Sequence, residues 1–138
     1  TDIVWYGSGG AADALWAGRP GQRTFTKNLA QSITGTYRPF VGDFDGNAID
    51  DIFFYGPGGE PDRVRWGTTR GSFATATTAV TVNRTYTPLS GDFNGDGASD
   101  VVWYGPGGAP DAQWAGRLGL RSFVTTIGTN VNGTYRPF

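Results

Sequence analysis

The sequence contains no cysteine, no histidine and no methionine. The lack of cysteine excludes a disulfide framework and any thiolate metal site. The lack of histidine removes the commonest general base and the commonest transition-metal ligand, and with them every Ser-His-Asp or Cys-His arrangement. The residue types that remain favour a binding or scaffold module over an enzyme.

The chain also lacks a large charge excess and a long apolar run. Its formal net charge is −1, and its eleven lysines and arginines are scattered singly rather than gathered in a stripe, so we expect no nucleic-acid partner. No apolar run approaches the length of a membrane span, and the N-terminus does not resemble a signal peptide. We therefore expect a mature or excised part of a larger product.

Glycine, proline and aromatic residues are abundant instead. The 138 residues include 23 glycines and 8 prolines, and 14% of them are aromatic. This composition predicts one folded domain made of short strands and tight turns, and it argues against a helical bundle.

The dominant pattern is a repeat of 49 residues. The segment Asp-Ile-Val-Trp-Tyr-Gly that starts at Asp2 returns, with small changes, at Asp51 and Asp100. In the middle copy, Trp66 stands one place later than Trp16 and Trp114 require, which we interpret as a small slip of the repeat. We divide the chain into repeat 1 (about 1–36, without its innermost strand), repeat 2 (about 37–85), repeat 3 (about 86–134) and a last innermost strand at 135–138.

Each full repeat predicts four antiparallel strands, which in the middle copy fall at about 37–42, 51–56, 62–67 and 72–81. The strand that starts at Asp51 is apolar at consecutive positions, so we expect protein to cover both of its faces. Repeated four-stranded antiparallel sheets are typical of β-propeller blades, and the predicted fold class is all-β. A β-sandwich built by duplication is the alternative.

Acidic residues gather in two loops, since seven of the twelve lie between residues 43 and 51 or between 92 and 100. Oxygen side chains stand at positions 1, 3, 5 and 9 of both loops, and we expect no nearby basic side chain to balance the carboxylates. Alternate side chains on a tightly curved loop can converge on one calcium ion, with a backbone carbonyl added at position 7. We therefore predict two calcium sites of low affinity, about 10⁻⁴ to 10⁻³ M, as in extracellular modules. The alternative is that these residues only form solvated turns.

The two loops differ at position 6, where Gly97 corresponds to Ala48. Glycine adopts a left-handed backbone more easily than alanine does, so the loop at 92–100 is predicted to be the better calcium site.

The chain resembles the FG-GAP or VCBS-type repeats of calcium-binding β-propellers, which occur in integrin α-subunit heads, fungal propeller lectins and many secreted bacterial proteins. The resemblance rests on D-F-N-G-D-G-A-S-D-V-V-W-Y-G-P-G, from Asp92, and D-F-D-G-N-A-I-D-D-I-F-F-Y-G-P-G, from Asp43. It implies an extracellular or secreted location and loops that join the innermost strand of a blade to the second. It assigns the calcium ligands to Asp43, Asp45, Asn47, Ile49 and Asp51 in one loop and to Asp92, Asn94, Asp96, Ala98 and Asp100 in the other.

Propellers of that family usually have about seven blades, whereas this chain has three repeats. The predicted innermost strand at 135–138 and the second strand near Asp2 are complementary parts of one blade. We therefore expect a homo-oligomer, with two chains forming six blades. A fragment of a longer single-chain propeller is the main alternative.

Two tryptophans recur at repeat spacing beside an arginine, and packing between blades is the first explanation for them. The second is a carbohydrate site, because an aromatic ring can cover the apolar face of a pyranose while a polar side chain fixes its hydroxyls. The candidate sugar-binding residues are Trp16, Arg19, Trp114 and Arg117.

Three function classes remain open. The favoured one is a calcium-stabilised propeller that recognises a glycan or a protein surface. The second is an enzyme in which Asp62 and Asp111 act as an acid and base pair of a glycosidase. A related alternative is that the chain is a non-catalytic appendage of a secreted glycan-active enzyme. The third is a structural or engineered repeat scaffold with no ligand except calcium.

Overall fold

The computed structural model describes residues 1–137, without the side chains of residues 28–30, 126 and 127. The described chain forms three antiparallel sheets, none of them closed, and contains one short 3-10 turn, η1 (Ser8–Gly10), but no α-helix. Sheet 1 contains β1 (Ile3–Trp5), β2 (Asp13–Gly18) and β3 (Phe25–Gln31). Sheet 2 contains β4 (Arg38–Gly42), β5 (Asp51–Tyr55), β6 (Asp62–Thr69) and β7 (Ser72–Val80). Sheet 3 contains β8 (Thr87–Gly91), β9 (Asp100–Tyr104), β10 (Asp111–Gly116) and β11 (Phe123–Thr129).

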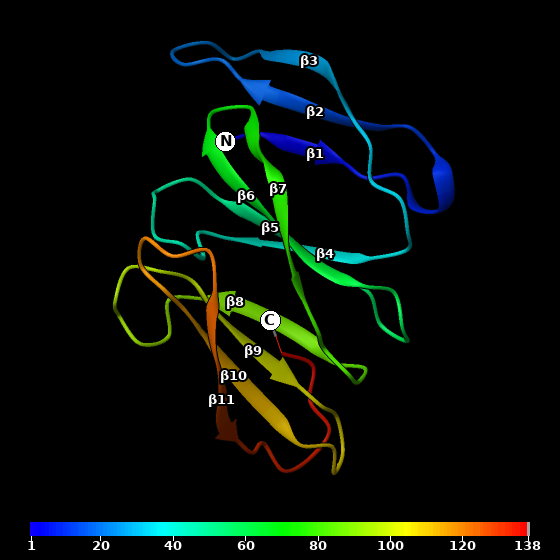
Figure 1. Cartoon of the computed structure of the whole chain (residues 1–138), viewed down its shortest axis with the longest axis vertical. Coiled ribbons are helices and arrows are strands. Elements are labelled where there is room, and N and C mark those ends of the chain that lie inside the picture. Colours follow the sequence, from blue (N-terminus) through cyan, green and yellow to red (C-terminus); the bar gives the residue numbers. More distant parts are fainter. Residues whose placement is uncertain (138) are drawn as a thin grey trace.

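The four strands predicted for the middle repeat are confirmed to within two residues at each end. Within each sheet the strands pair in chain order, so every connection is a hairpin between neighbours. The three sheets follow one another along the longest axis of the molecule (Figure 1). This succession of three sheets excludes the two-sheet β-sandwich.

The core consists of two aromatic layers, one on each side of sheet 2. Phe53 and Tyr55 of β5 pack toward Val101 and Trp103 of sheet 3. Ile52 and Phe54, on the opposite face of β5, pack toward Val4, Tyr6, Ile33 and Tyr37. All five residues of β5 are buried, which confirms the prediction that protein covers both faces of this strand.

The interpretation of Trp66 as a slip of the repeat is wrong. Arg65 pairs with Ile52 in the register in which Trp16 pairs with Ile3 and Trp114 with Val101. Successive residues of a strand point to opposite faces, so the tryptophan at the next position faces the other way. Trp66 accordingly lies in the layer between sheets 2 and 3, where its ring centroid is 6.3 Å from that of Phe123.

The linkers between sheets are fastened by a tyrosine that recurs in all three repeats. The Tyr55 hydroxyl donates to the Arg84 carbonyl (2.6 Å) and accepts from the Tyr86 amide (2.8 Å). Tyr6 binds Gly35 and Tyr37 in the same way, and Tyr104 binds Gly133 and Tyr135. Each tyrosine therefore directs the chain that leaves its sheet toward the place where the next sheet begins.

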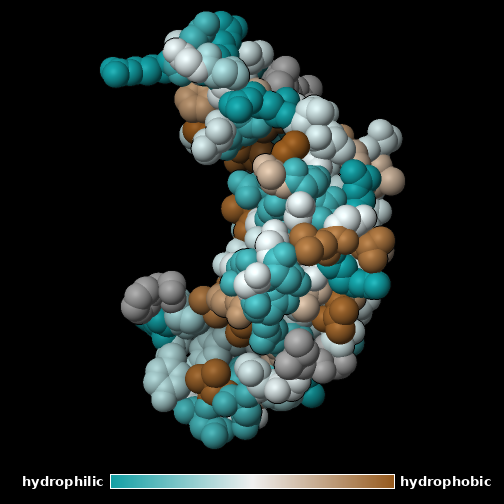
Figure 2. All heavy atoms as spheres, turned by 90° about the vertical axis from the view of Figure 1, so that its left-hand side faces the viewer, coloured by the Kyte–Doolittle hydropathy of each residue, from teal (hydrophilic) through white to brown (hydrophobic). Residues whose placement is uncertain are grey.

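The first strands of sheets 2 and 3 contact each other. β4 and β8 lie side by side, and the Ser90 hydroxyl donates to the Val41 carbonyl (2.7 Å). The whole chain follows an arc that is hollowed on one side (Figure 2). Tyr135 to Pro137 form no strand in this single chain, and Phe138, the end of the predicted strand, lies outside the described residues. Among the described residues, no helix is long and apolar enough to cross a membrane.

Candidate metal site

The loop between β4 and β5, which we call loop 1 (residues 43–51), gathers three carboxylates. One oxygen from each of Asp43, Asp45 and Asp51 lies within 4.8 Å of the other two. Gly46 and Ala48 produce the necessary curvature, because both adopt a left-handed backbone, with φ of 68° and 67°. Loop 1 therefore places three hard oxygen ligands around one centre, as a calcium site requires.

Asp45 is the member of this cluster that has a buried oxygen without a hydrogen-bond donor. Its residue is 6% exposed, and Oδ1 has no hydrogen-bond partner among the described residues. The Arg121 Nε atom lies 3.6 Å from Oδ2, so the prediction that no basic side chain lies near the loops is wrong for loop 1. Arg121 comes from the β10–β11 turn of sheet 3, and it reaches only one oxygen of one carboxylate. A buried oxygen without a donor is rare in folded proteins, and a cation at the centre of the cluster is a suitable partner for it.

Asp51 is both a predicted ligand and part of the fold. Its Oδ1 accepts from the Gly67 amide and its Oδ2 from the Phe44 amide, each at 2.8 Å. Burial raises the pKa of Asp51 from 3.8 to about 7, the two amides oppose this, and the nearby Asp45 and Asp43 carboxylates raise the pKa further. The charge of the cluster is therefore unfavourable until a cation balances it.

The other predicted ligands of loop 1 hold its backbone in this structure. The Asp43 carboxylate accepts from the amides of Asn47 (2.9 Å) and Ala48 (2.7 Å). The side-chain oxygen of Asn47 accepts from the Ile49 amide (2.8 Å), and its Nδ2 donates to the Gly67 carbonyl (3.0 Å). Loop 1 is thus held in its curved form by its own polar groups, with Asn47 and Ile49 adjacent to the carboxylates.

The loop between β8 and β9, which we call loop 2 (residues 92–100), is curved in the same way but more open. Asp92 accepts from the amides of Gly95, Asp96 and Gly97. Asn94 Nδ2 donates to Asp96 Oδ2 (3.0 Å), and Asp96 Oδ1 accepts from the Ala98 amide (2.9 Å). Asp100 is buried, like Asp51. Within the described chain, however, only loop 1 brings three carboxylates together.

The two loops differ in sequence and in their surroundings. At position 3, where loop 1 contributes Asp45 to the cluster, loop 2 has the amide Asn94. Loop 1 is covered by loop 2 and by the β10–β11 turn of sheet 3. The Ser99 amide of loop 2 donates to the Asp43 carbonyl and the Gly119 amide of the turn to the Asp45 carbonyl, both at 2.7 Å. Loop 2 has no following sheet in the described chain. Consequently Phe93 is 52% exposed, whereas Phe44 at the same position of loop 1 is fully buried.

The pKa of Asp51 predicts how stability depends on pH. A carboxyl group whose pKa is raised in the folded state binds its proton more tightly there than in the unfolded chain. With calcium removed, we expect the free energy of unfolding to fall as pH rises from about 4 to about 7, the window between the ordinary and raised pKa values. Urea titrations across this range measure the slope. Asp51→Asn should reduce it and Asp50→Asn, an exposed neighbour, should leave it unchanged, while an unaltered slope in Asp51→Asn contradicts the assignment.

A second prediction concerns position 6 of the loops. Ala48 is the one residue other than glycine with positive φ among the described residues, and Gly97 occupies the same position of loop 2 with φ of 95°. A left-handed backbone costs an L-residue roughly 1–2 kcal/mol. We expect Ala48→Gly to stabilise the protein and strengthen calcium binding in loop 1, and Gly97→Ala to have the opposite effects at loop 2. Calorimetric titration of the two variants checks this, and effects of the same sign contradict it.

The predicted sugar-binding residues occupy two different environments. Trp114 packs in the layer between sheets 2 and 3, with ring centroids 5.2 Å from Trp103 and 6.4 Å from Phe53. Trp16 stands at the same position of sheet 1, 5.1 Å from Trp5 and with Lys27 Nζ 4.8 Å from its ring centroid. The arginines Arg19 and Arg117 are exposed, and Arg19 Nε donates to the Thr26 hydroxyl (3.2 Å).

Asp62 and Asp111, the residues of the glycosidase alternative, occupy equivalent places and not two contrasting ones. Asp62 accepts from the amides of Gly56 and Val82, both at 2.7 Å. Asp111 accepts from Gly105 and Val131, and Asp13 accepts from Gly7 and Ile33. Burial raises the pKa of Asp62. Each aspartate therefore joins its second-to-third strand hairpin to the chain that leaves its sheet, whereas an acid and base pair needs two environments.

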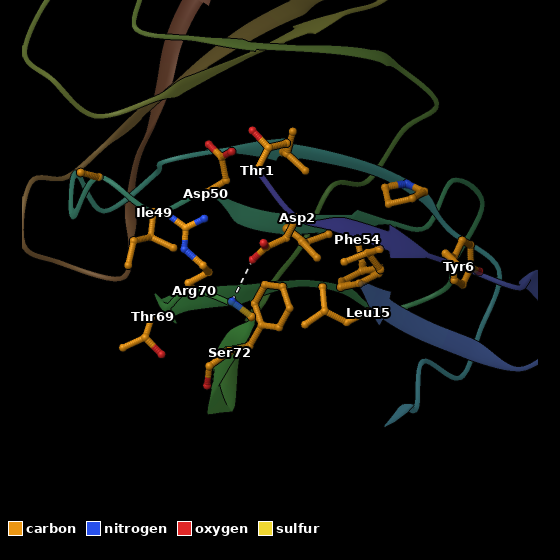
Figure 3. Close-up of a pocket in the computed structure, with 17 residues that line it drawn as sticks. Thr1, Asp2, Tyr6, Leu15, Ile49, Asp50, Phe54, Thr69, Arg70 and Ser72 are labelled. Carbon is orange, nitrogen blue, oxygen red and sulfur yellow. Dashed lines mark hydrogen bonds between the residues drawn. The ribbon is translucent and has the colours of Figure 1, made fainter. Parts of the chain in front are cut away.

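A pocket of about 640 Å³ lies between sheets 1 and 2, beside β1. Leu15 and Phe54 form its apolar part, and Asp2, Asp50 and Arg70 lie around its polar part (Figure 3). The Asp2 carboxylate, at position 9 of its repeat, accepts from the Gly18 and Gly71 amides, both at 2.8 Å. No sequence pattern predicts this pocket, because it forms only where β1 meets the β6–β7 turn and β4.

Comparison with protein families is consistent with this geometry. Residues 43–103, which contain loop 1, loop 2 and sheet 2, match the family described as FG-GAP-like repeat. No curated protein and no solved structure matches the chain significantly.

Proposed function

The chain carries repeats of the FG-GAP type, and from this premise we propose that it is a calcium-binding β-propeller module that serves recognition rather than catalysis. The observation that carries the proposal is the convergence of Asp43, Asp45 and Asp51, with a buried oxygen of Asp45 left without a donor. The metal would stabilise the fold and take no part in a reaction.

Calcium fits this donor set because it prefers six to eight hard oxygen ligands in flexible geometry. Asp43, Asp45 and Asp51 would supply carboxylates, Asn47 an amide oxygen and Ile49 a backbone carbonyl. The corresponding residues of loop 2 are Asp92, Asn94, Asp96, Ala98 and Asp100. A bound ion would fix the loop between the first two strands of a sheet and, in loop 1, hold it against sheet 3. An affinity in the range of extracellular modules accords with the secreted location that we propose.

Calorimetric titration with calcium tests the proposal. We expect the protein to bind calcium, and Asp45→Asn to weaken binding at loop 1 while keeping the size of the side chain. Asp50→Asn is the matched control, because Asp50 adjoins the cluster and is exposed. Folded protein that takes up no calcium, or equal binding by both variants, contradicts the proposal.

We propose a glycan or a protein surface as the recognised partner. For carbohydrate the candidate ring is Trp16, because Trp114 packs against the aromatic layer between sheets 2 and 3. A glycan array probed in excess calcium should give signals that Trp16→Ala removes and Glu60→Ala, an exposed control on sheet 2, retains. An array without signals would leave a protein surface or a purely structural role.

We further propose that the propeller is closed by a second chain, so that two chains supply six blades.

A further inference from the structure

Two arginines stand in the junction between sheets 1 and 2. Arg63 of β6 has the register position that Ala112 has in β10, and Arg65, two residues further, has the position of Trp114. Ala112 and Trp114 pack against the apolar layer between sheets 2 and 3. The same strand positions are therefore apolar in one junction and positively charged in the other.

The residue that contacts Arg65 differs between the two junctions as well. Gln31 pairs with Asp13, the first residue of β2. Val80 pairs in the same way with Asp62, the first residue of β6, and packs against the apolar layer between sheets 2 and 3. Gln31 Oε1 instead accepts from Arg65 Nη1 at 2.6 Å. An arginine and a glutamine thus stand where the next junction has a tryptophan and a valine.

The two arginines are not held equally. Arg63 Nη2 donates to the Thr34 carbonyl (2.7 Å), which fastens Arg63 to the linker after β3. The guanidinium carbon of Arg65 lies 5.8 Å from the Phe73 ring centroid, and its bond to Gln31 is made by one nitrogen. A guanidinium carries five N–H donors, so Arg65 has donors left for a further partner.

No carboxylate forms an ion pair with Arg65 in the part of the chain that the structure describes. The ion pair found there lies at loop 1, and none of the residues 28–30 beside Gln31 is acidic. Burial lowers the pKa of Arg65, the charge of Arg63 lowers it further, and Asp13 opposes both. A partly buried cation without a counterion costs free energy that an apolar pair avoids. Such a group indicates a binding role, because packing alone does not need it.

A pocket of about 390 Å³ lies beside this guanidinium, between the end of β3 and the first half of β7. We call it the Arg65 pocket. Besides Arg65, Gln31 and the Phe73 ring, its lining includes three hydroxyl side chains, those of Ser32, Ser72 and Thr75. These three residues are exposed, so their hydroxyl groups are open to a ligand.

We propose that the Arg65 pocket binds a hydroxylated carboxylate, that is, a sugar acid, either free or as one residue of a saccharide chain. The planar guanidinium would hold the carboxylate through paired hydrogen bonds. The hydroxyl groups of the lining would bond to those of the ligand, and Phe73 would face the apolar side of the sugar ring. An acidic peptide side chain offers the charge without the adjacent hydroxyl groups, so the lining favours the sugar acid.

The inference rests on the proposed recognition function, but it depends neither on the calcium loops nor on Trp16. Trp16 packs against Trp5 (5.1 Å between ring centroids). Val4 and Tyr6, the neighbours of Trp5 in β1, face sheet 2 instead. Successive residues of a strand point to opposite faces, so Trp16 and the Arg65 pocket lie on opposite sides of sheet 1.

Calorimetric titration of the full chain with galacturonate tests the ligand class. We expect galacturonate to bind about tenfold or more tightly than its neutral methyl ester, because the ester cannot accept charge-assisted hydrogen bonds from Arg65. A trimer of galacturonate distinguishes the two sources: tighter binding of the trimer indicates a saccharide chain, and equal binding indicates the free acid. Equal binding of acid and ester, or tighter binding of a glutamate peptide than of galacturonate, overturns the inference.

A double variant copies the next junction into this one. Gln31→Val combined with Arg65→Trp introduces the residues used between sheets 2 and 3, so we expect a folded protein that binds galacturonate about tenfold or more weakly. Thermal unfolding checks that the fold is intact. Arg65→Gln, which removes the charge and keeps a polar side chain, should lose binding to a similar extent. Arg23→Gln removes an exposed charge from the β2–β3 turn and should bind as the wild type does.

Unchanged binding by Arg65→Gln overturns the assignment, whether or not the double variant folds. Asp45→Asn and Trp16→Ala should both bind galacturonate as the wild type does, which separates this site from the calcium site and from the Trp16 ring. A chain that binds calcium but no sugar acid overturns this inference and leaves the calcium function in place. A chain that binds galacturonate through Arg65 but takes up no calcium supports this inference and contradicts the calcium function.

Discussion

Replacing Trp103 by alanine is expected to lower the free energy of unfolding by about 3–5 kcal/mol, the range for a large aromatic residue removed from a core. Trp103 is 1% exposed, and its ring centroid lies 5.3 Å from Phe53 and 5.2 Å from Trp114. Its indole nitrogen has no hydrogen-bond partner among the described residues, so the loss comes from packing alone. The same substitution at Trp5, which is 48% exposed, is expected to cost much less in a dilute, monomeric chain.

Urea denaturation followed by circular dichroism measures both variants. The measurement should be made at a protein concentration at which the wild type is monomeric, so that loss of assembly does not contribute to the Trp5→Ala result. Equal losses for the two tryptophans would contradict the two-sided burial of sheet 2 on which the fold description depends.

Removing calcium is expected to have the second-largest effect. At a free calcium concentration about 100 times the dissociation constant, one site adds roughly 2.7 kcal/mol to stability if the unfolded chain does not bind the ion. For a domain of this size that corresponds to a fall in melting temperature of roughly 10 °C on chelation. Asp45→Asn should lose most of the part that comes from loop 1.

Thermal unfolding with calcium, with magnesium and with excess chelator checks this expectation. Magnesium is the control cation, because it demands a smaller octahedral shell and gives up water reluctantly. A melting temperature that is the same in calcium and in chelator would contradict the proposal that the metal stabilises the fold. An equal response to magnesium would assign the effect to general charge screening.

Much of the fold could be predicted because the repeat places the same local signals three times. The strand boundaries follow from turn residues, and the continuous apolar run at β5 required cover on both faces, which Phe53 and Phe54 receive from different sheets. The error at Trp66 came from aligning tryptophans by identity. Asp62 keeps the 49-residue spacing from Asp13 and Asp111. Counting from Asp62 shows that Arg65, and not Trp66, corresponds to Trp16 and Trp114. Trp66, at the next position, therefore faces the other neighbouring sheet.

The candidate site was predicted as two independent loops, and that is where local sequence patterns were insufficient. The left-handed backbone that made Ala48 suspect is present, with φ of 67°, yet the loop that contains it is the one that gathers its carboxylates. One reason is composition, because loop 2 has Asn94 where loop 1 has Asp45. The other is tertiary: Arg121 and Gly119 reach loop 1 from the β10–β11 turn of sheet 3, and Ser99 reaches it from loop 2, and the pattern of ligand positions within a loop does not predict these contacts. The sequence repeat likewise does not predict which positions are buried in one repeat and exposed in another, because this depends on how the sheets pack.

A crystal structure of the protein grown with calcium, with anomalous data to identify the ion, would show whether loop 1 is a calcium site. We expect one anomalous peak among the carboxylates of Asp43, Asp45 and Asp51, at oxygen distances of about 2.3–2.6 Å, and Asp45 Oδ1 as one of the ligands. Well-ordered loop 1 density with water or an Arg121 contact at that centre, and no calcium there, would contradict it.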